Sequence, residues 1–198
     1  LKNFRQLGSK AAGHPEYGHF LGTDTTTGPL GEGISSAVGM ALAEKITSAR
    51  YGKDVCDHYT YVMLGDGCLM EGVAQESIAL AGHWKLNKLI ALWDDNGITI
   101  DGKVNIASST DIPALFKANK WNVIKIDGHN FYQIERAVKK AKKSDKPTLI
   151  VAKTIIGYGA PNKCNSPKCH GSPLGEDELK SMRKNLNWDY EPFEIPNE

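Results

Sequence analysis

The sequence predicts an α/β fold in which a parallel β-sheet carries helices on both faces. Two observations lead to this prediction. Segments with strand character alternate along the chain with segments of helical character, as in βαβ units. The strand segments are continuous apolar runs rather than runs in which apolar and polar residues alternate, which is typical of strands buried on both faces.

Short apolar runs predict four strands, each within the four to eight residues that strands usually span. The first follows a polar stretch and ends at the glycine-rich sequence around residue 65, and the others have a similar length. These strands are expected at residues 59–64, 88–93, 121–126 and 148–153.

Helical periodicity and end signals predict five helices. In the first, apolar residues recur at helical spacing until Gly52 marks a stop. Pro113 suits the first turn of another helix, and Asn130 is a suitable N-cap. The predicted helices cover residues 34–46, 71–84, 111–119, 130–143 and 175–186, while loops are expected at 1–27 and 157–173 and an extended tail at 192–198.

Composition narrows the classes of function. The 198 residues suffice for one large domain with a substantial core, and 40% hydrophobic with 24% charged residues is ordinary for a soluble protein. A net charge of +1 gives no general electrostatic reason to expect nucleic acid or acidic membranes as partners, and no apolar stretch approaches a membrane span. The polar start lacks both a signal peptide and an initiator Met, so the chain is expected to be cut from a longer one.

The four cysteines have irregular spacing, and we interpret them as reduced thiols of a cytoplasmic or organellar enzyme, with a plastid not excluded. Cys164, Cys169 and His170 form a C-x4-C-H pattern, but without a second pair it is a weak zinc signal. The basic run at 139–143 is interpreted as the solvated face of a helix, and Trp84 and Trp93 as packing residues.

The first candidate site follows the first predicted strand, where the chain reads Gly65-Asp66-Gly67. Ligands of open α/β sheets bind at the carboxyl ends of the strands, and glycines let backbone N–H groups approach an anion closely. Asp66 would repel a phosphate unless a cation lay between them. A plain turn explains the same three residues equally simply.

The second predicted strand ends in a matching polar sequence, Asp94-Asp95-Asn96-Gly97-Ile98. Asn96 follows Asp66 by 30 residues, one strand–helix–strand crossover later, so both strands end at one edge of a parallel sheet. A carboxylate oxygen, an amide oxygen and a backbone carbonyl turned inward near Gly97 suit magnesium or calcium, with phosphate oxygens completing the shell. The alternative is two unrelated loop ends with turn-forming residues.

The sequence Gly65-Asp66-Gly67, followed about 30 residues later by Asp94-Asp95-Asn96, resembles the thiamine diphosphate-binding motif. The chain as a whole resembles the transketolase family. The matching stretches run in family order across nearly the whole chain. They are G-H-P-E (13–16), T-T-T-G-P-L-G-E-G-I (25–34), A-V-G-M-A (37–41), G-D-G-C-L-M-E-G (65–72), L-A-G-H-W-K-L (80–86), D-D-N-G-I-T-I-D-G (94–102), K-T-I-I-G-Y-G (153–159), H-G-S-P-L (170–174) and P-F-E-I-P (192–196).

The resemblance implies a metal and cofactor site. Asp66 matches the carboxylate ligand of the metal, Asn96 its amide ligand, and Ile98 the residue whose backbone carbonyl reaches the metal. Gly67 matches the glycine whose N–H meets the diphosphate. Two residues of the G-P-L-G stretch, Gly28 and Leu30, match the lining of the aminopyrimidine and thiazolium pocket.

The resemblance also implies catalytic and interface residues. His14 matches a histidine that contacts the sugar near its reacting carbons, and His170 one near the diphosphate and substrate, although on residue type alone each is a loop histidine. Glu71 and Glu76 match acidic residues that link the two active sites across a homodimer interface. Acids near a helix start are also favoured by the helix dipole, which explains them without that role.

The implied activity is the reversible transfer of a two-carbon ketol unit from a ketose phosphate to an aldose phosphate, in the pentose phosphate pathway or the Calvin cycle. It would require thiamine diphosphate and Mg²⁺ or Ca²⁺. Residues 1–191 are expected to form the diphosphate- and metal-binding domain without its N-terminal segment. Residues 192–198 are expected to begin the linker to a missing pyrimidine-binding domain, so the chain alone should be inactive.

Other functions, both catalytic and non-catalytic, remain open as alternatives. The chain could be a non-catalytic module that keeps the metal and diphosphate cradle, or one subunit of a split transketolase. Dihydroxyacetone synthase shares much of the framework. 1-Deoxyxylulose 5-phosphate synthase fits less well because G-H-P-E and H-G-S-P-L resemble transketolase specifically.

Overall fold

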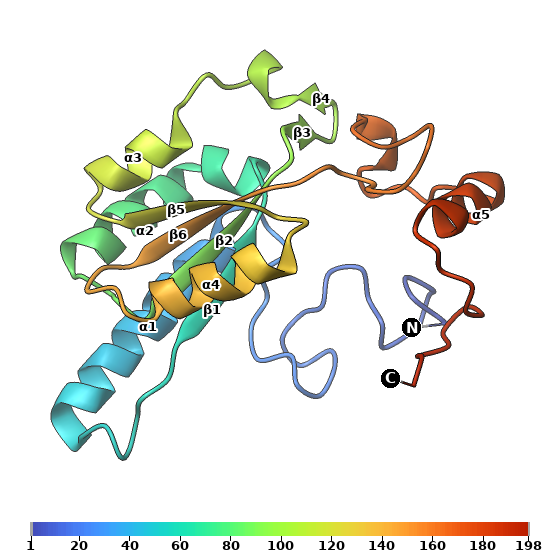
Figure 1. Ribbon diagram of the computed structural model, residues 1–198. Coiled ribbons are helices and arrows are strands. Elements are labelled where there is room, and N and C mark those ends of the chain that lie inside the picture. Colours follow the sequence, from blue (N-terminus) through green and yellow to red (C-terminus); the bar gives the residue numbers. More distant parts are fainter. Residues whose placement is uncertain (1, 198) are drawn as a thin grey trace. The chain divides into compact units, whose positions relative to one another are not determined.

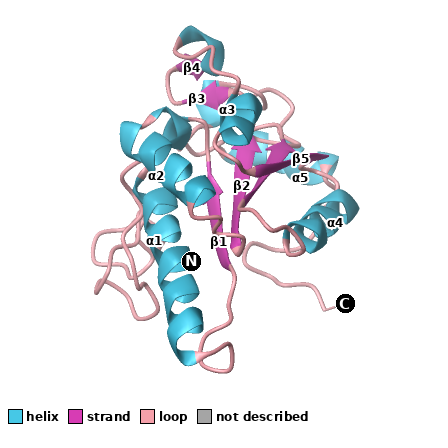
Figure 2. Cartoon of the chain, turned by 90° about the vertical axis from the view of Figure 1, so that its left-hand side faces the viewer, coloured by secondary structure: helices cyan, strands magenta, loops and turns pink. Residues whose placement is uncertain are grey.

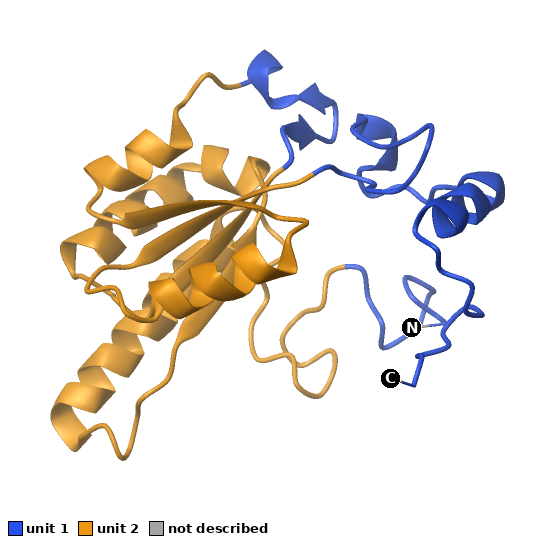
Figure 3. Cartoon of the chain, in the orientation of Figure 1, with its two compact units in different colours: residues 1–13, 96–107, 155–198 blue, residues 14–95, 108–154 orange. Residues whose placement is uncertain are grey.

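A computed structural model of the chain describes residues 2–197, which form two compact units (Figures 1 and 3). The sheet unit comprises His14–Asp95 and Ser108–Thr154. The loop-rich unit comprises residues 1–13, Asn96–Ala107 and residues 155–198, of which the terminal residues 1 and 198 lie outside the description.

The sheet unit is built on a four-stranded parallel sheet with the order β1-β2-β6-β5. Leu64 at the end of β1 is opposite Trp93 of β2, so these two strands end at the same edge. The strands are β1 (Thr60–Leu64), β2 (Leu89–Asp95), β5 (Asn122–Asp127) and β6 (Thr148–Lys153).

Helices cover both faces of this sheet unequally (Figure 2). Three of them, α1 (Glu32–Tyr51), α2 (Gly72–His83) and α3 (Ile112–Ala118), pack on one face in a core that includes Leu89, Ala91 and Phe116. The other face carries α4 (Phe131–Ala141), which packs through Ala137 and Ala141 against Ile90 and Ile150. The alternation of side chains along each strand divides the apolar runs between these two cores.

Local sequence signals account for the helix ends. Asp111 caps α3 by accepting a hydrogen bond from the Ala114 N–H at 2.9 Å, and Asn130 caps α4 by accepting from the Gln133 N–H at 3.0 Å. Gly52, with φ +93°, ends α1. These caps satisfy backbone groups that a helix end would otherwise leave without partners.

The loop-rich unit contains a hairpin of two short strands, β3 (Ile98–Thr99) and β4 (Gly102–Lys103), and the helix α5 (Glu176–Asn185). Glu178 of α5 organises the loop before it. Its Oε1 accepts from the N–H groups of Asn162 at 2.7 Å and Lys163 at 2.9 Å, and its Oε2 accepts from Asn162 Nδ2 at 2.9 Å. These hydrogen bonds, led by that of the Asn162 side chain, lower the pKa of Glu178.

The predicted fold class is confirmed, and so are the four predicted strands and the five helices, with ends shifted by a few residues at most sites. Residues 2–27 contain neither helix nor strand, as expected. The β3–β4 hairpin and three short 3₁₀ helices were not predicted. Within the described residues, none of the helices combines the length and the apolar character needed to cross a bilayer.

Candidate functional site

Asp66 lies just beyond the carboxyl end of β1, where it is the N-cap of the 3₁₀ helix Gly67–Met70. Its side chain is buried, with 7% of the residue exposed, and its Oδ1 accepts a hydrogen bond of 3.2 Å from Trp93 Nε1. Trp93 belongs to β2 and is equally buried. Removing a carboxylate from water is costly unless hydrogen-bond donors or a cation compensate, and the indole N–H of Trp93 is one such donor.

Gly67 lies in close contact with the segment before α1. A Cβ on Gly67 would lie 3.1 Å from Leu30 Cδ1, whereas a Cβ on Gly65 would meet no atom within 4 Å. Neither glycine has a positive φ. The G-D-G sequence therefore does not need glycine for a left-handed turn, and at Gly67 the missing side chain instead lets the segment before α1 approach the end of β1.

The segment before α1 brings further predicted residues into the same neighbourhood. A Cβ on Gly28 would lie 3.3 Å from His14 Cβ, so the G-H-P-E and G-P-L-G stretches are in close contact. Leu30, two residues further on, reaches Gly67. The sheet unit thus places His14, Gly28, Leu30 and Gly67 as successive neighbours beside Asp66, with the side chains of His14 and Leu30 exposed.

Glu71 is the N-cap of α2 and has an extended backbone, so it precedes the helix rather than lying in its first turn. A Cβ on Gly31 would lie 2.8 Å from Glu71 Cβ, which places Glu71 against the start of α1. Glu76 is exposed on α2, as are Val73 and Leu80 on the same helix. Spacings of three, four and seven residues put these three side chains on one face.

In the loop-rich unit, Asn96 directly follows the last residue of β2 in the chain. Its Oδ1 accepts a hydrogen bond of 2.9 Å from the N–H of Ile98, across Gly97 with φ +72°. The bend expected at Gly97 is therefore present, and it holds the amide in one orientation. An amide oxygen has two lone pairs, and this hydrogen bond uses one of them.

His170 follows the 3₁₀ helix Pro167–Cys169, and its N–H donates to the carbonyl oxygen of Pro167 at 3.0 Å. Its side chain is exposed. Asn96, Ile98 and His170 all belong to the loop-rich unit, whereas Asp66 belongs to the sheet unit. A metal shared between Asp66 and Asn96 therefore stays a prediction.

Cysteines and metal-binding clusters add no further site. All four cysteines are free thiols. Across residues 2–197, no group of three or more His, Cys, Asp or Glu side chains is placed to hold a metal ion. The predicted ligand set contains one carboxylate, one amide and one backbone carbonyl. It therefore differs from a cluster of three His, Cys, Asp or Glu side chains.

Sequence reasoning missed one member of the site. Trp93 was interpreted as a packing residue, and it does pack in the core, but it also orients Asp66. Only its place opposite Leu64 in the sheet register indicates that second role. Register between parallel strands is a tertiary property that a single sequence does not display.

Over residues 1–198 the chain matches the family model described as transketolase, thiamine diphosphate binding domain. The chain belongs to the transketolase family. Transketolase 2 of Vibrio vulnificus is 57% identical over 202 residues, which cover all of this chain and 30% of that protein. The chain therefore spans about three tenths of the length of this curated transketolase.

Solved transketolase structures share the fold. The transketolase of Campylobacter jejuni superposes with a TM-score of 0.94 at 44% identity, covering 98% of this chain and 31% of that one. A transketolase of Pichia stipitis, solved in complex with sedoheptulose 7-phosphate, gives a TM-score of 0.92 at 44% identity, covering 98% of this chain and 30% of that one. Similarity at this level shows that the chain and these transketolases share one fold.

Proposed function

We propose that this chain forms the diphosphate- and metal-binding part of a transketolase that transfers a two-carbon ketol unit from a ketose phosphate to an aldose phosphate. The observation that carries the proposal is the buried Asp66, oriented by Trp93 and adjoining Gly67, in a chain of this family. Residues 1–191 would act as the diphosphate domain, and 192–198 would lead toward a pyrimidine-binding domain. The pentose phosphate pathway or the Calvin cycle would use this reaction.

The residues present fit a divalent ion. The Asp66 carboxylate, the Asn96 amide oxygen and the backbone carbonyl of Ile98 would bind Mg²⁺ or Ca²⁺, both of which prefer oxygen ligands. Burial of Asp66 and the fixed orientation of Asn96 support this assignment, because ligands held in place lose little freedom when the ion binds. The Gly67 N–H would donate to the diphosphate, whose charge the ion balances.

The pocket for the rings would be lined by Gly28 and Leu30. Leu30 is 53% exposed and offers an apolar surface, and the absence of a side chain on Gly28 keeps His14 close to it. Thiamine diphosphate, when bound, supplies the electron sink that allows a carbon–carbon bond beside a carbonyl to break. The protein's own contribution there is to orient the cofactor and exclude water.

Two histidines would contact the hydroxyl groups of the sugar and take part in proton transfer. We assign His14 and His170 to orienting substrate hydroxyls and transferring protons, a contribution of roughly 10²–10⁴-fold for a well-placed imidazole. Both side chains are exposed, so both can reach a substrate. The sugar phosphate named in the Pichia stipitis structure supports ketose phosphates as the substrate class.

A homodimer would complete the active site. Glu71 and Glu76 would lie at its interface, and the exposed Val73 and Leu80 on α2 supply apolar area that an interface could bury. Because the chain spans about 30% of its curated relatives, we expect negligible ketol transfer from it alone. A cytoplasmic or organellar location fits its four free thiols.

Calorimetry tests this proposal without requiring turnover. Thiamine diphosphate is titrated into the chain with and without Mg²⁺ or Ca²⁺, for the wild type and for Asp66→Asn, Asn96→Ala and the exposed control Asp145→Asn. We expect weak, metal-dependent binding that both site variants reduce about tenfold or more, because each removes one ligand of the metal. The proposal would be contradicted if thiamine diphosphate bound equally well with and without the metal. It would also be contradicted if Asp66→Asn bound thiamine diphosphate as tightly as Asp145→Asn.

A further inference from the structure

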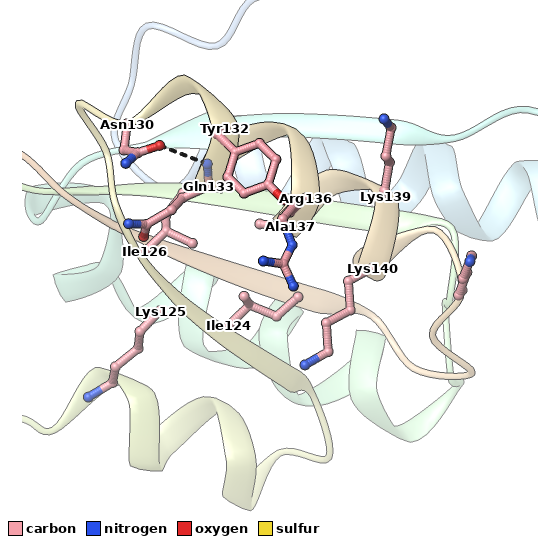
Figure 4. Close-up of a pocket in the computed structure, with 11 residues that line it drawn as sticks. Ile124, Lys125, Ile126, Asn130, Tyr132, Gln133, Arg136, Ala137, Lys139 and Lys140 are labelled. Atoms are coloured by element: carbon pink, nitrogen blue, oxygen red, sulfur yellow. Dashed lines mark hydrogen bonds between the residues drawn. The ribbon is translucent and has the colours of Figure 1, made fainter.

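A basic hollow of about 870 Å³ lies in the sheet unit between β5 and α4 (Figure 4). Eleven residues line it, none of them Asp or Glu. Five of the eleven are cations, namely Lys125, Arg136, Lys139, Lys140 and Lys143. An open hollow lined by cations without a compensating acid attracts anions.

Helical geometry gathers three of these cations along one side of the hollow. Arg136, Lys140 and Lys143 are four and three residues apart, so they follow one side of α4 and of the turn at its end, over about 10 Å. Figure 4 shows Arg136 and Lys140 extending from α4 toward Ile124 of β5. A row of this length matches two or three linked phosphate groups.

Little in the protein neutralises this row. Lys139 forms an i,i+4 salt bridge with Glu135 on the same helix, and the Arg136 guanidinium lies 5.4 Å from the centre of the Tyr132 ring. Across residues 2–197 the other four cations of the hollow take part in no salt bridge. Favourable interaction with the helix dipole explains cations in the last turn, but not Arg136 or the strand residue Lys125. Their mutual repulsion is relieved when an anion binds.

The floor of the hollow is apolar. Ile124 and Ile126 alternate along β5, so they share one face, and they pack beside Ala137 in the core under α4. Tyr132 stands at the rim with 65% of its surface exposed. A hollow of this size lies within the roughly 300–1,000 Å³ of small-molecule sites, which combine an apolar surface with a few polar anchors.

We propose that the basic hollow binds a nucleoside di- or triphosphate, with its phosphates along Arg136, Lys140 and Lys143 and its ring over Tyr132 and the isoleucine floor. Guanidinium and ammonium groups are the side chains best suited to phosphate. Nucleic acid fits less well, because the cations span only about two helical turns and the chain has a net charge of +1. The proposal is independent of the cofactor site, since Asp66 does not line the hollow.

Titration calorimetry of ATP into the chain tests the assignment. The variant Arg136→Gln/Lys140→Gln should bind ATP about tenfold more weakly or worse, because it loses two charge-assisted contacts. The control Lys117→Gln/Lys142→Gln removes the same charge outside the hollow and should stay within about twofold of wild type. Asp66→Asn should bind ATP as wild type does, which separates this site from the thiamine diphosphate site.

Two further ligands distinguish the source of the phosphate. Inorganic tripolyphosphate carries the charge without a ring, and fructose 1,6-bisphosphate carries two phosphates on a sugar. Both should bind more weakly than ATP, because they cannot cover the apolar floor. The proposal would be overturned if ATP did not bind, or if tripolyphosphate or fructose 1,6-bisphosphate bound as tightly as ATP. It would also be overturned if the control variant lost as much ATP affinity as Arg136→Gln/Lys140→Gln.

Discussion

The indole Nε1 of Trp93 donates to Oδ1 of Asp66 across the ends of two neighbouring strands, at 3.2 Å. The bond joins a residue of β2 to the residue that begins the 3₁₀ turn after β1, so it fixes the carboxylate relative to the sheet. A carboxylate held by a rigid element can bind an ion with little loss of freedom. We therefore regard Trp93 as a positioning residue for the proposed metal.

Replacing Trp93 by Phe tests this role because it keeps an aromatic ring and removes the donor. We expect the free energy of unfolding to fall by about 1–3 kcal/mol, the range for a hydrogen bond to a charged group plus some repacking. Metal-dependent binding of thiamine diphosphate should weaken as well. Urea denaturation and calorimetry measure the two effects. The half-exposed Trp188→Phe is the control, and equal effects from both variants would contradict the role.

Much of the fold could be predicted because its signals are local. The cap at Asn130 and the stop at Gly52 act within a few residues, and each is used as expected. The β3–β4 hairpin escaped prediction because strands of two residues show no periodicity.

The candidate site was predicted as separate motifs, not as an arrangement. Residues His14, Gly28, Leu30 and Gly67 lie in three stretches of sequence, and only the fold shows that they are successive neighbours. The turn at Asp66 is present, but glycine at position 67 is explained by its close contact with Leu30 rather than by a left-handed backbone. Contacts between distant segments depend on register and on helix packing, which residue type alone does not specify.

Two helical glycines should respond oppositely to alanine. A Cβ on Gly82 of α2 would lie 1.6 Å from the carbonyl oxygen of Asn119, which is backbone and cannot rotate away. Gly82→Ala should therefore destabilise the protein by about 3 kcal/mol or more. Gly39 in α1 is exposed and has no atom within 4 Å of the added Cβ, so Gly39→Ala should stabilise it by about 0.5–1 kcal/mol. Thermal and urea unfolding measure the change in stability for each variant. If both variants raise or both lower the stability, the packing of α2 on the end of α3 is contradicted.

The contribution of Glu178 should depend on pH. Hydrogen bonds, chiefly from the Asn162 side chain, hold its pKa below the ordinary value of 4.5 in the folded state. A folded-state pKa below the unfolded value stabilises the protein above pH 4.5, and this stabilisation is lost as the pH falls through the folded value. Glu178→Gln should therefore destabilise the protein at pH 7 and have little effect well below pH 4.5. Urea unfolding at several pH values checks this, with the exposed Glu176→Gln as the control, and a destabilisation that is constant across pH would count against it.

Gly67 offers a test in which a second substitution should restore what the first removes. A Cβ on Gly67 would crowd Leu30 Cδ1 at 3.1 Å, so Gly67→Ala should lower stability by about 1 kcal/mol and weaken thiamine diphosphate binding by displacing Leu30. Leu30→Ala combined with Gly67→Ala removes the crowded atom, and it should recover most of the lost stability but not the apolar contact with the cofactor. Gly65→Ala, whose Cβ would meet nothing within 4 Å, should leave stability unchanged. If the double variant is no more stable than Gly67→Ala alone, Leu30 is not the group that requires glycine at position 67.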